Sequence, residues 1–331
     1  MGDSLSKFYI FTPMNIIGGG AEALHQMAYY MRKMSIDAYT VYYAYSGFCE
    51  TKPLERYDEY EVVTAKYEDI EDTERNYVIA PENAPWCLNG FYKAQKCIWW
   101  LGLIASQVYM GDWRYRLHYL RRRLMGRSVN SARKLLFNPK ECWHLCGSKY
   151  AYMELRNRYP NSVVEYMVEP ISLDYLRMGN GGLAQERENI VLFNPAKPSD
   201  RMTELVNRSR FNYVPLEGLP PDGLAEMYKK AKLYVDFGDF GGPERMPKEA
   251  VYFGCNILVV NHNAASNDFD VAIPQKYKVD EEINVEQIED QIADMLEHYE
   301  SQYSDILSFK TKVENLEENF CKHIRNVFLE K

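Results

Sequence analysis

The sequence predicts an α/β protein with two Rossmann-like halves, because a strand, a glycine loop, a helix and a second strand follow one another twice. In the first half, an apolar strand at 7–13 leads into the triple glycine at 18–20, a helix with apolar residues at helical spacing, and a strand at 38–43. In the second half, the apolar run at 233–235 leads into a three-glycine loop, a helix and a strand at 257–260. Ligands of such folds bind at the carboxyl ends of the strands, so both glycine loops mark candidate sites.

Length and composition narrow the class of protein. A chain of 331 residues predicts two domains, and 46% hydrophobic with 26% charged residues is typical of a globular protein. The net charge of −8 argues against general nucleic-acid binding. The sequence lacks both a run of about 18 apolar residues and a signal-peptide apolar region, so we expect a cytoplasmic protein. The seven cysteines are scattered and odd in number, as expected of reduced thiols.

Further periodic segments extend both halves. Strands of the first half are predicted at 77–81, 97–101, 142–146 and 163–170, with a helix at 150–159. Strands of the second half are predicted at 189–195 and 213–218, with helices at 224–231, 286–299 and 301–328. Pro170 and the polar stretch 178–189 mark the domain boundary. The acidic segment 50–75 is predicted to form surface strand and loop.

Charged residues directly follow two of these strands. Glu82 follows the strand at 77–81, and the carboxyl end of a strand is where an α/β protein places its chemistry. A helix N-cap or a solvated loop explains a carboxylate there equally well. Lys197 and Arg201 follow the strand at 189–195, at the start of a helix, where cations suit a diphosphate. A polar loop is the alternative.

The second glycine loop leads into a helix with charged residues at its mouth. Gly241 and Gly242 let a ligand approach the backbone closely, and Pro247 suits the first turn of a helix. Arg245 and Glu249 offer a cation and a carboxylate together. This combination suits a phosphorylated, hydroxyl-rich ligand such as a nucleotide-sugar.

One basic segment, 113–134, interrupts the acidic chain. Its arginines alternate with aromatic and aliphatic residues, as in amphipathic helices that lie on anionic membranes. A solvated basic face, or a patch for an acidic acceptor or partner, remains an alternative. The candidate membrane-surface residues are Arg116, Arg121, Arg122, Arg123 and Arg127.

The candidate metal sites are weak. Cys142, His144 and Cys146 lie within five residues, but a second Cys/His pair is missing nearby, so we interpret them as packed thiols. The triple glycine lacks the GxGxxG spacing of a dinucleotide site, which argues against a nicotinamide-linked oxidoreductase. We therefore predict no metal and no cofactor.

A set of short segments, in order along nearly the whole chain, resembles bacterial glycosyltransferases of the GT-B type. The likeness is closest to the retaining enzymes of capsule and cell-surface polysaccharide clusters. The segments are GGGAEALHQMAYYMR (18–32), VIAPE (78–82), CIWWLG (97–102), HLCGSKYAYMEL (144–155), VLFNPAK (191–197), LYVDFG (233–238), PERMPKEA (243–250) and DVAIPQKYK (270–278).

The resemblance implies an architecture and its ligands. It implies two Rossmann-like domains facing across a cleft, with residues 1–170 binding the acceptor and residues 171–309 the nucleotide-sugar, UDP- or GDP-linked. Residues 310–331 would form a C-terminal helix that crosses back to the N-terminal domain. Helix dipoles and cations replace a metal in such enzymes, although Asp268-Phe269-Asp270 matches the metal-binding DxD of another glycosyltransferase architecture.

The resemblance also assigns roles to individual residues. Glu249 matches the carboxylate on the donor ribose, and Lys197 the cation on the donor diphosphate, with Arg201 or Arg245 as a second cation. Glu82 stands near the reacting sugar, as an acceptor-orienting group or base. Gly241 and Gly242 belong to the donor loop. The glycines facing the donor phosphates and the acceptor are Gly18, Gly19 and Gly20.

Two departures from the family pattern leave two functions open. The family pairs two glutamates eight positions apart, but Gly241 stands eight before Glu249. Asn263-Ala264-Ala265 replaces an expected Gly-Ser-Ala. One function is metal-independent, retaining glycosyl transfer to a hydroxyl of a bacterial surface glycan. The other is a non-catalytic glycosyltransferase-like subunit that binds a partner enzyme and the membrane surface.

Overall fold

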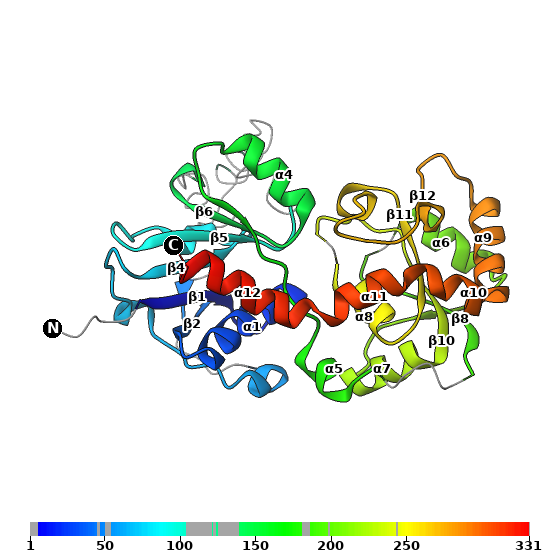
Figure 1. Ribbon diagram of the computed structural model, residues 1–331, viewed down its shortest axis with the longest axis horizontal. Helices are drawn as coiled ribbons and strands as arrows, with labels where there is room; N and C mark the ends of the chain where they lie inside the picture. The colour runs from blue at the N-terminus through cyan, green and yellow to red at the C-terminus, as the bar shows by residue number, and fades with distance from the viewer. Residues whose placement is uncertain are drawn as a thin grey trace. The chain divides into compact units, whose positions relative to one another are not determined.

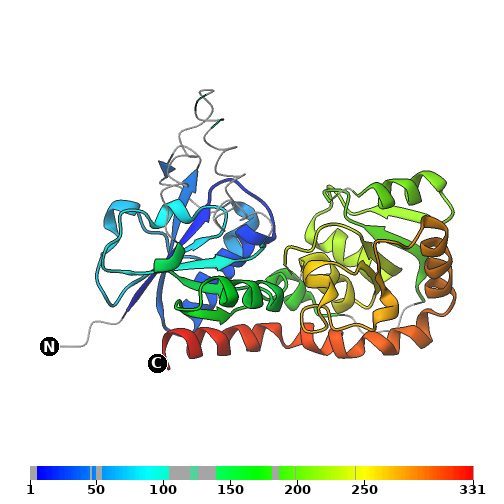
Figure 2. The same cartoon turned by 90° about the horizontal axis from the view of Figure 1, so that it is seen from above.

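The computed structural model describes residues 6–44, 47–49, 54–103, 121, 124, 139–180, 186–197, 199–242 and 244–330. The chain divides into two compact units (Figures 1 and 2). Unit 1 contains Met1–Pro170 and Glu318–Lys331, and unit 2 contains Ile171–Glu317. Most of the basic segment 113–134, including Arg116, Arg122, Arg123 and Arg127, lies outside the described residues, whereas Arg121 and Leu124 are described and exposed.

Unit 1 is built on a seven-stranded sheet in the order β3-β2-β1-β4-β5-β6-β7. Only the short β3 runs antiparallel to its neighbour, and the other pairs are parallel. The predicted strands are confirmed, except that the last one is shorter than expected. The strands are β1 (Lys7–Pro13), β2 (Asp37–Ala44), β3 (Gly47–Phe48), β4 (Tyr77–Pro81), β5 (Gln95–Trp100), β6 (Trp143–Cys146) and β7 (Val164–Tyr166).

Helices cover both faces of this sheet. On one face, α1 (Gly19–Lys33) and α12 (Leu316–Phe328) share a core with the strands. The Phe320 ring of α12 stacks on Trp99, with the ring centroids 5.8 Å apart. On the other face, α4 (Lys149–Arg158) packs with the short 3-10 helix η3 (Pro85–Leu88). Burial of these apolar faces is the main stabilising contribution to the unit.

The acidic segment 50–75 differs from its prediction. Where it is described, it forms two 3-10 helices, η1 (Glu55–Tyr60) and η2 (Tyr67–Asp69), instead of a surface strand. Tyr57 and Tyr60 are buried beneath η1, although acidic residues surround them in the sequence. Their rings pack beside His25 of α1, and the hydrophobic effect of these rings outweighs the polar composition of the segment. A further 3-10 helix, η5 (Pro139–Glu141), precedes β6.

Unit 2 is built on a five-stranded parallel sheet in the order β12-β11-β10-β8-β9. The central strands β10 and β11 contain continuous buried runs, residues 233–235 and 257–260, as expected of a sheet covered on both faces. The strands are β8 (Glu188–Phe193), β9 (Asn212–Pro215), β10 (Ala231–Asp236), β11 (Asn256–Val260) and β12 (Lys278–Val279).

The helices of unit 2 pack around this sheet (Figure 1). Helix α7 contacts β8 and β10, α8 contacts β10 and β11, and α9 contacts β10. The single helix predicted at 301–328 is divided into several pieces. The helices are α5 (Leu173–Met178), α6 (Asp200–Arg208), α7 (Pro221–Lys230), α8 (Arg245–Tyr252), α9 (Val285–Glu297), α10 (Tyr299–Tyr303) and α11 (Leu307–Glu314), with 3-10 turns η6 (Asn263–Ser266), η7 (Gln275–Tyr277) and η8 (Ser304–Ile306).

Among the described residues, every helix falls short of the length and apolar character that crossing a membrane requires.

Candidate functional site

Lys197 lies at the carboxyl edge of the unit 2 sheet, in the turn after β8. Its side chain runs over Gly238, the turn after β10: a Cβ at Gly238 would stand 3.2 Å from the Cβ of Lys197 and 3.4 Å from its Cδ. The Lys197 ammonium forms an ion pair with Glu244. Gly238 is therefore the residue whose lack of a side chain lets the lysine reach Glu244.

A buried carboxylate, Asp236, and a half-buried one, Glu244, surround this lysine. Asp236 ends β10, and its carboxylate accepts hydrogen bonds from the Gly238 amide and the Tyr234 hydroxyl, both at 3.0 Å. Burial raises the pKa of Asp236, and these donors together with Lys197 offset part of the rise. Burial likewise raises the pKa of Glu244, against the attraction of Lys197. The Lys197 ammonium is the cation that compensates both acids.

The backbone of Glu244 is held in an unusual conformation directly before α8. Its φ is +42°, in the left-handed region that non-glycine residues seldom adopt. One turn into α8, the Arg245 Nε lies 3.7 Å from the Glu249 Oε1, and both side chains are largely buried. Lys248 is buried beside them. The start of α8 thus gathers cations and carboxylates within one helical turn.

The loops flanking α8 fit tightly against the core. Gly241 and Gly242 are buried. The departure at Asn263 has a structural explanation: its φ is +49°, which glycine adopts freely and asparagine tolerates better than most residues. Ala264 and Ala265 are buried in η6. Asn263 therefore preserves the turn that a glycine would make.

Arg201 is held by hydrogen bonds to the segment that follows β12. Its guanidinium donates to the main-chain carbonyls of Asp280 and Glu281, which follow β12. Arg201 could bind a donor phosphate only if these hydrogen bonds broke. Arg245, in contrast, lies beside Glu249.

Glu82 occupies the carboxyl edge of the unit 1 sheet, directly after β4, and is only 7% exposed. Its Oε2 accepts a hydrogen bond from the Leu101 amide at 3.2 Å. Burial raises the pKa of Glu82 to about 7; hydrogen bonds from backbone amides, including those of Leu101 and Gly102, oppose the rise, and the charge of Glu169 adds to it. A carboxyl with this pKa exchanges protons near neutral pH, as acid–base catalysis requires.

Glu169 is a second buried carboxylate at this edge, which we had not singled out in the sequence. Its carboxylate lies beside Gly147, close to the turn that follows β5. A Cβ on Gly147 would stand 3.5 Å from the Glu169 Oε2 and 3.2 Å from the Trp100 carbonyl oxygen. The Gly147 amide donates to that carbonyl at 2.9 Å. Glu82 and Glu169 therefore approach the same turn from two different strands.

The triple glycine lies at the same edge. Gly20 is next to this turn too, since a Cβ there would stand 3.7 Å from the Leu101 Cδ1. The Gly18 amide donates to the Tyr57 hydroxyl at 3.0 Å, and that hydroxyl lies 3.3 Å from the Ile16 carbonyl oxygen. Gly18 has an extended backbone, and no atom lies within 4 Å of the position that a Cβ would take. Gly19 begins α1. The structure thus brings Glu82, Glu169 and the glycine loop together.

The sequence and the fold can be compared with those of known proteins. Neither a protein-family model nor a curated protein matches the sequence. Solved structures do match: T4 phage BGT in complex with its UDP-glucose substrate has a TM-score of 0.57 and 11% identity, covering 98% of this chain and 99% of that one. The chain has the GT-B fold of glycosyltransferases.

Two further structures with the GT-B fold support this assignment. WaaG, a glycosyltransferase involved in lipopolysaccharide biosynthesis, has a TM-score of 0.57 and 13% identity, covering 96% of this chain and 99% of that one. The spinosyn forosaminyltransferase SpnP has a TM-score of 0.52 and 14% identity, covering 99% of each chain. Identities this low establish the GT-B fold and leave the activity to be argued from the site.

Three residues of this GT-B chain were missed as site residues, for different reasons. Glu169 lies inside the strand predicted at 163–170, and only the earlier end of the observed strand β7, at Tyr166, places it beyond the strand. Glu244 precedes a predicted helix and has cations nearby in the sequence, which is a usable signal for a site residue. Tyr57 carries no local signal, because its partner Gly18 lies 39 positions away in the chain.

The predicted metal candidates have other roles in this GT-B chain. The His144 Nδ1 accepts a hydrogen bond from the Trp100 Nε1 at 3.0 Å, inside the core of unit 1. Asp268 pairs with Lys278 at 2.7 Å, and Asp270 is buried. Among the described residues, no group of three or more His, Cys, Asp or Glu side chains is arranged to hold a metal.

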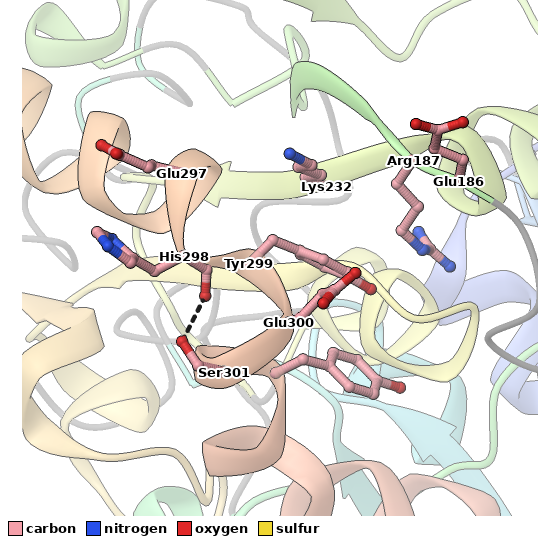
Figure 3. Close-up of a pocket in the computed structure, with 9 residues that line it drawn as sticks. Glu186, Arg187, Lys232, Glu297, His298, Tyr299, Glu300 and Ser301 are labelled. Carbon is pink, nitrogen blue, oxygen red and sulfur yellow. Dashed lines mark hydrogen bonds between the residues drawn. The ribbon is translucent and has the colours of Figure 1, made fainter.

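A cavity of about 630 Å³ lies at the opposite edge of the unit 2 sheet (Figure 3). It is lined by residues near the amino ends of β8 and β10 and by α10, including Arg187, Lys232 and Tyr299. The Arg187 guanidinium donates to the carbonyls of Tyr228, Ala231 and Phe253, so it joins four segments of the chain. We regard this arginine as structural, because ligands of the GT-B fold bind at the other edge.

Proposed function

We propose that this protein is a glycosyltransferase that moves a sugar from a nucleoside-diphosphate sugar, UDP- or GDP-linked, to a hydroxyl of a bacterial surface glycan. The observation that carries the proposal is the cluster of Lys197, Arg245 and Glu249 at the carboxyl edge of unit 2 in a chain with the GT-B fold. BGT was solved with UDP-glucose, and WaaG acts in lipopolysaccharide biosynthesis, which supports both substrate classes.

On the donor side, we assign residues 171–309 to the nucleotide-sugar. The leaving diphosphate gains negative charge as its bond to the sugar breaks, and preorganised cations stabilise that charge. Lys197 would meet the diphosphate after exchanging Glu244 for phosphate oxygens, and Arg245 would be the second cation. Glu249 would accept hydrogen bonds from the ribose hydroxyls. This chemistry needs no metal, and we propose that the anomeric configuration is retained.

On the acceptor side, we assign residues 1–170 together with the C-terminal segment. The acceptor oxygen bonds to the anomeric carbon, the bond from that carbon to the diphosphate breaks, and the acceptor proton passes to a base. Glu82 is the candidate base, with Gly18, Gly19 and Gly20 presenting the loop that the reacting groups approach. Because Gly18 has room for a methyl group, Gly18→Ala should preserve folding while slowing transfer.

The donor assignment is tested by binding. In a thermal-shift measurement, either UDP or GDP should raise the melting temperature, because a ligand that binds only the folded state stabilises that state. Glu249→Ala should lower both the shift and the turnover at least tenfold. Glu226→Ala, which removes an exposed glutamate of α7, is the matched control. Wild-type turnover in Glu249→Ala would remove the assignment.

The acceptor class is tested by transfer. We propose surface glycans, glycolipids among them, and a position at the inner face of the membrane through residues 113–134. An α-glucosyltransferase solved with UDP and a DNA 13-mer matches with a TM-score of 0.50, so DNA belongs in the screen. The net charge of −8 disfavours DNA. Transfer to DNA and to no glycan would overturn this part of the proposal.

A second candidate function is a non-catalytic subunit that supports a partner enzyme. The observation that favours it is Gly241, which stands where the family carries its first glutamate. The two functions differ in one measurement: donor hydrolysis or transfer by the isolated protein, screened over several nucleotide-sugars. Turnover supports the enzyme, whereas nucleotide binding without turnover supports the subunit.

A further inference from the structure

A small cavity of about 220 Å³ opens at the carboxyl edge of the unit 1 sheet. Its walls come from the ends of three neighbouring strands, β2, β1 and β4, and from the residues that follow them. The lining residues are Pro13, Met14, Ile16, Tyr43, Ala44, Asn83, Ala84 and Trp86.

The lining is mainly apolar. The Tyr43 and Trp86 rings meet edge to face, 5.6 Å apart and at 84°, and both residues are buried. Polar side-chain atoms come from these two rings and from Asn83, whose Oδ1 accepts a hydrogen bond from the Tyr43 hydroxyl at 3.4 Å. The other lining side chains are aliphatic. A sugar ring in this cavity would place several hydroxyls against aliphatic side chains, where they find no hydrogen-bond partner. Burying such hydroxyls costs free energy, so the cavity disfavours a sugar ring.

The size of the cavity fits a ring or a short chain. An apolar cavity of about 150 Å³ is sufficient to bind benzene in another protein. A cavity of about 220 Å³ therefore has room for an aryl ring or a short acyl segment. Aromatic walls such as Tyr43 and Trp86 add favourable contact with such a group.

The cavity adjoins the groups that we assign to the acceptor. Asn83 directly follows Glu82, and Ile16 precedes the triple glycine. The Ile16 carbonyl and the Gly18 amide are both near the Tyr57 hydroxyl, which fixes this wall relative to the glycine loop. The cavity walls therefore belong to the same two segments that carry Glu82 and the glycine loop.

We propose that this cavity binds an apolar group, aryl or acyl, that the acceptor carries next to its reacting hydroxyl. The inference rests on the proposed function and names the acceptor class: a glycolipid or aryl glycoside rather than a bare oligosaccharide. The glycan is then recognised through the group to which it is attached.

The test is a donor-free binding measurement on the full chain. Phenyl β-D-glucoside and methyl β-D-glucoside are titrated with intrinsic tryptophan fluorescence and ligand-observed NMR as readouts. The phenyl compound should bind at least tenfold more tightly. Ala44→Leu, which fills the cavity, should abolish that preference. Ala65→Leu, a half-buried alanine of unit 1 outside the cavity, should retain it.

Two further variants keep the test decisive. Should Ala44→Leu fail to fold, Ile16→Asp places a charge at an exposed rim position and should likewise reduce the preference at least threefold. Asn83→Ala should change phenyl glucoside affinity less than threefold, since an apolar occupant does not need the amide.

Several results would overturn the inference. These are equal affinity for the two glucosides, a preference that survives both Ala44→Leu and Ile16→Asp, a large loss in Asn83→Ala, or binding of neither compound. Nucleoside-diphosphate binding is measured separately by thermal shift. The proposed function can therefore stand when this inference fails, and failure of donor binding leaves the glucoside result interpretable.

Discussion

The carboxyl edges of the two sheets compensate buried acids in different ways. In unit 1, Glu82 is buried against backbone amides with Glu169 nearby, and its pKa rises to about 7. In unit 2, Glu244 and Glu249 each have a side-chain cation, Lys197 and Arg245. Burial, opposed only in part by the backbone amides, leaves the Glu82 carboxyl able to gain or lose a proton near neutrality. In unit 2 the partners of the acids are charged side chains, Lys197 and Arg245, and each of these cations can exchange its carboxylate for a phosphate oxygen.

The largest expected effect concerns how the free energy of unfolding of unit 1 depends on pH. The pKa of Glu82 is raised from 4.5 to about 7, and at about 1.4 kcal/mol per pKa unit this corresponds to about 3 kcal/mol. Because the folded pKa is the higher one, this stability is fully present below pH 4.5 and is lost as pH rises through about 7. We expect Glu82→Gln to lose less stability than wild type over that range in urea unfolding.

Glu154→Gln, on the exposed side of α4, is the control for that experiment and should follow wild type. Parallel curves for wild type and Glu82→Gln would mean that the backbone amides hold Glu82 charged, and the contrast between the two edges would disappear.

The next effect concerns donor binding in unit 2. Lys197→Ala should weaken nucleoside-diphosphate binding at least tenfold, about 1.4 kcal/mol. It should also destabilise the fold by leaving the half-buried Glu244 without its cation. The double variant Lys197→Ala/Glu244→Ala should recover part of the stability, since Asp236 still lacks the cation, and none of the affinity, as measured by thermal unfolding and calorimetry. Lys276→Ala removes an exposed lysine paired with Asp305 and serves as the control. Full donor affinity in the double variant would refute the role of Lys197.

A smaller effect tests the coupling within unit 1. If Glu82 is the base, kcat/KM should rise as pH increases through about 7, when its carboxyl loses a proton. Burial is the largest cause of the raised pKa of Glu82, and the charge of Glu169 is a smaller one. Glu169→Gln should therefore lower the pH midpoint of the profile, but by less than the whole rise in the pKa of Glu82. The measurement is the pH profile of kcat/KM. An unchanged midpoint would show that the two carboxyls act independently.

The smallest effect concerns the glycine loop. Tyr57→Phe removes the hydroxyl that accepts from the Gly18 amide, and one such hydrogen bond contributes about 1 kcal/mol. We expect a melting temperature lower by a few degrees, at about 2 °C or more per kcal/mol, and a raised KM for the acceptor with little change in donor binding. Tyr92→Phe, at an 89% exposed position, should match wild type in both assays.

Local signals predicted most of the fold. The apolar runs of β1, β4 and β10 and the glycines before α1 and α8 identified both Rossmann-like halves, because strand burial and helix entry depend on nearby residues. The same local rule selected Glu82 and Lys197 as strand-end residues. The segment of η1 was mispredicted, since its acidic composition conceals two buried tyrosines.

The site needed contacts that sequence spacing does not reveal. Arg201 stands where a donor cation would be expected, yet it donates to carbonyls about 80 positions away. Asn263 was noted as a departure, and only its positive φ explains why asparagine is accepted there. Neither result follows from residue type, because each depends on which distant backbone segment lies alongside.

By itself, the sequence determined the two α/β halves, their glycine loops, and the positions of Glu82, Lys197, Arg245 and Glu249 at strand and helix ends. Only the tertiary structure decided which partners these side chains have: Glu169 for Glu82, Glu244 for Lys197, and the Tyr57 hydroxyl for the glycine loop. The physical reason is range. Burial patterns and helix starts are encoded by neighbours in the chain, whereas the electrostatics of a buried carboxyl depend on strands brought together by the order of the sheet.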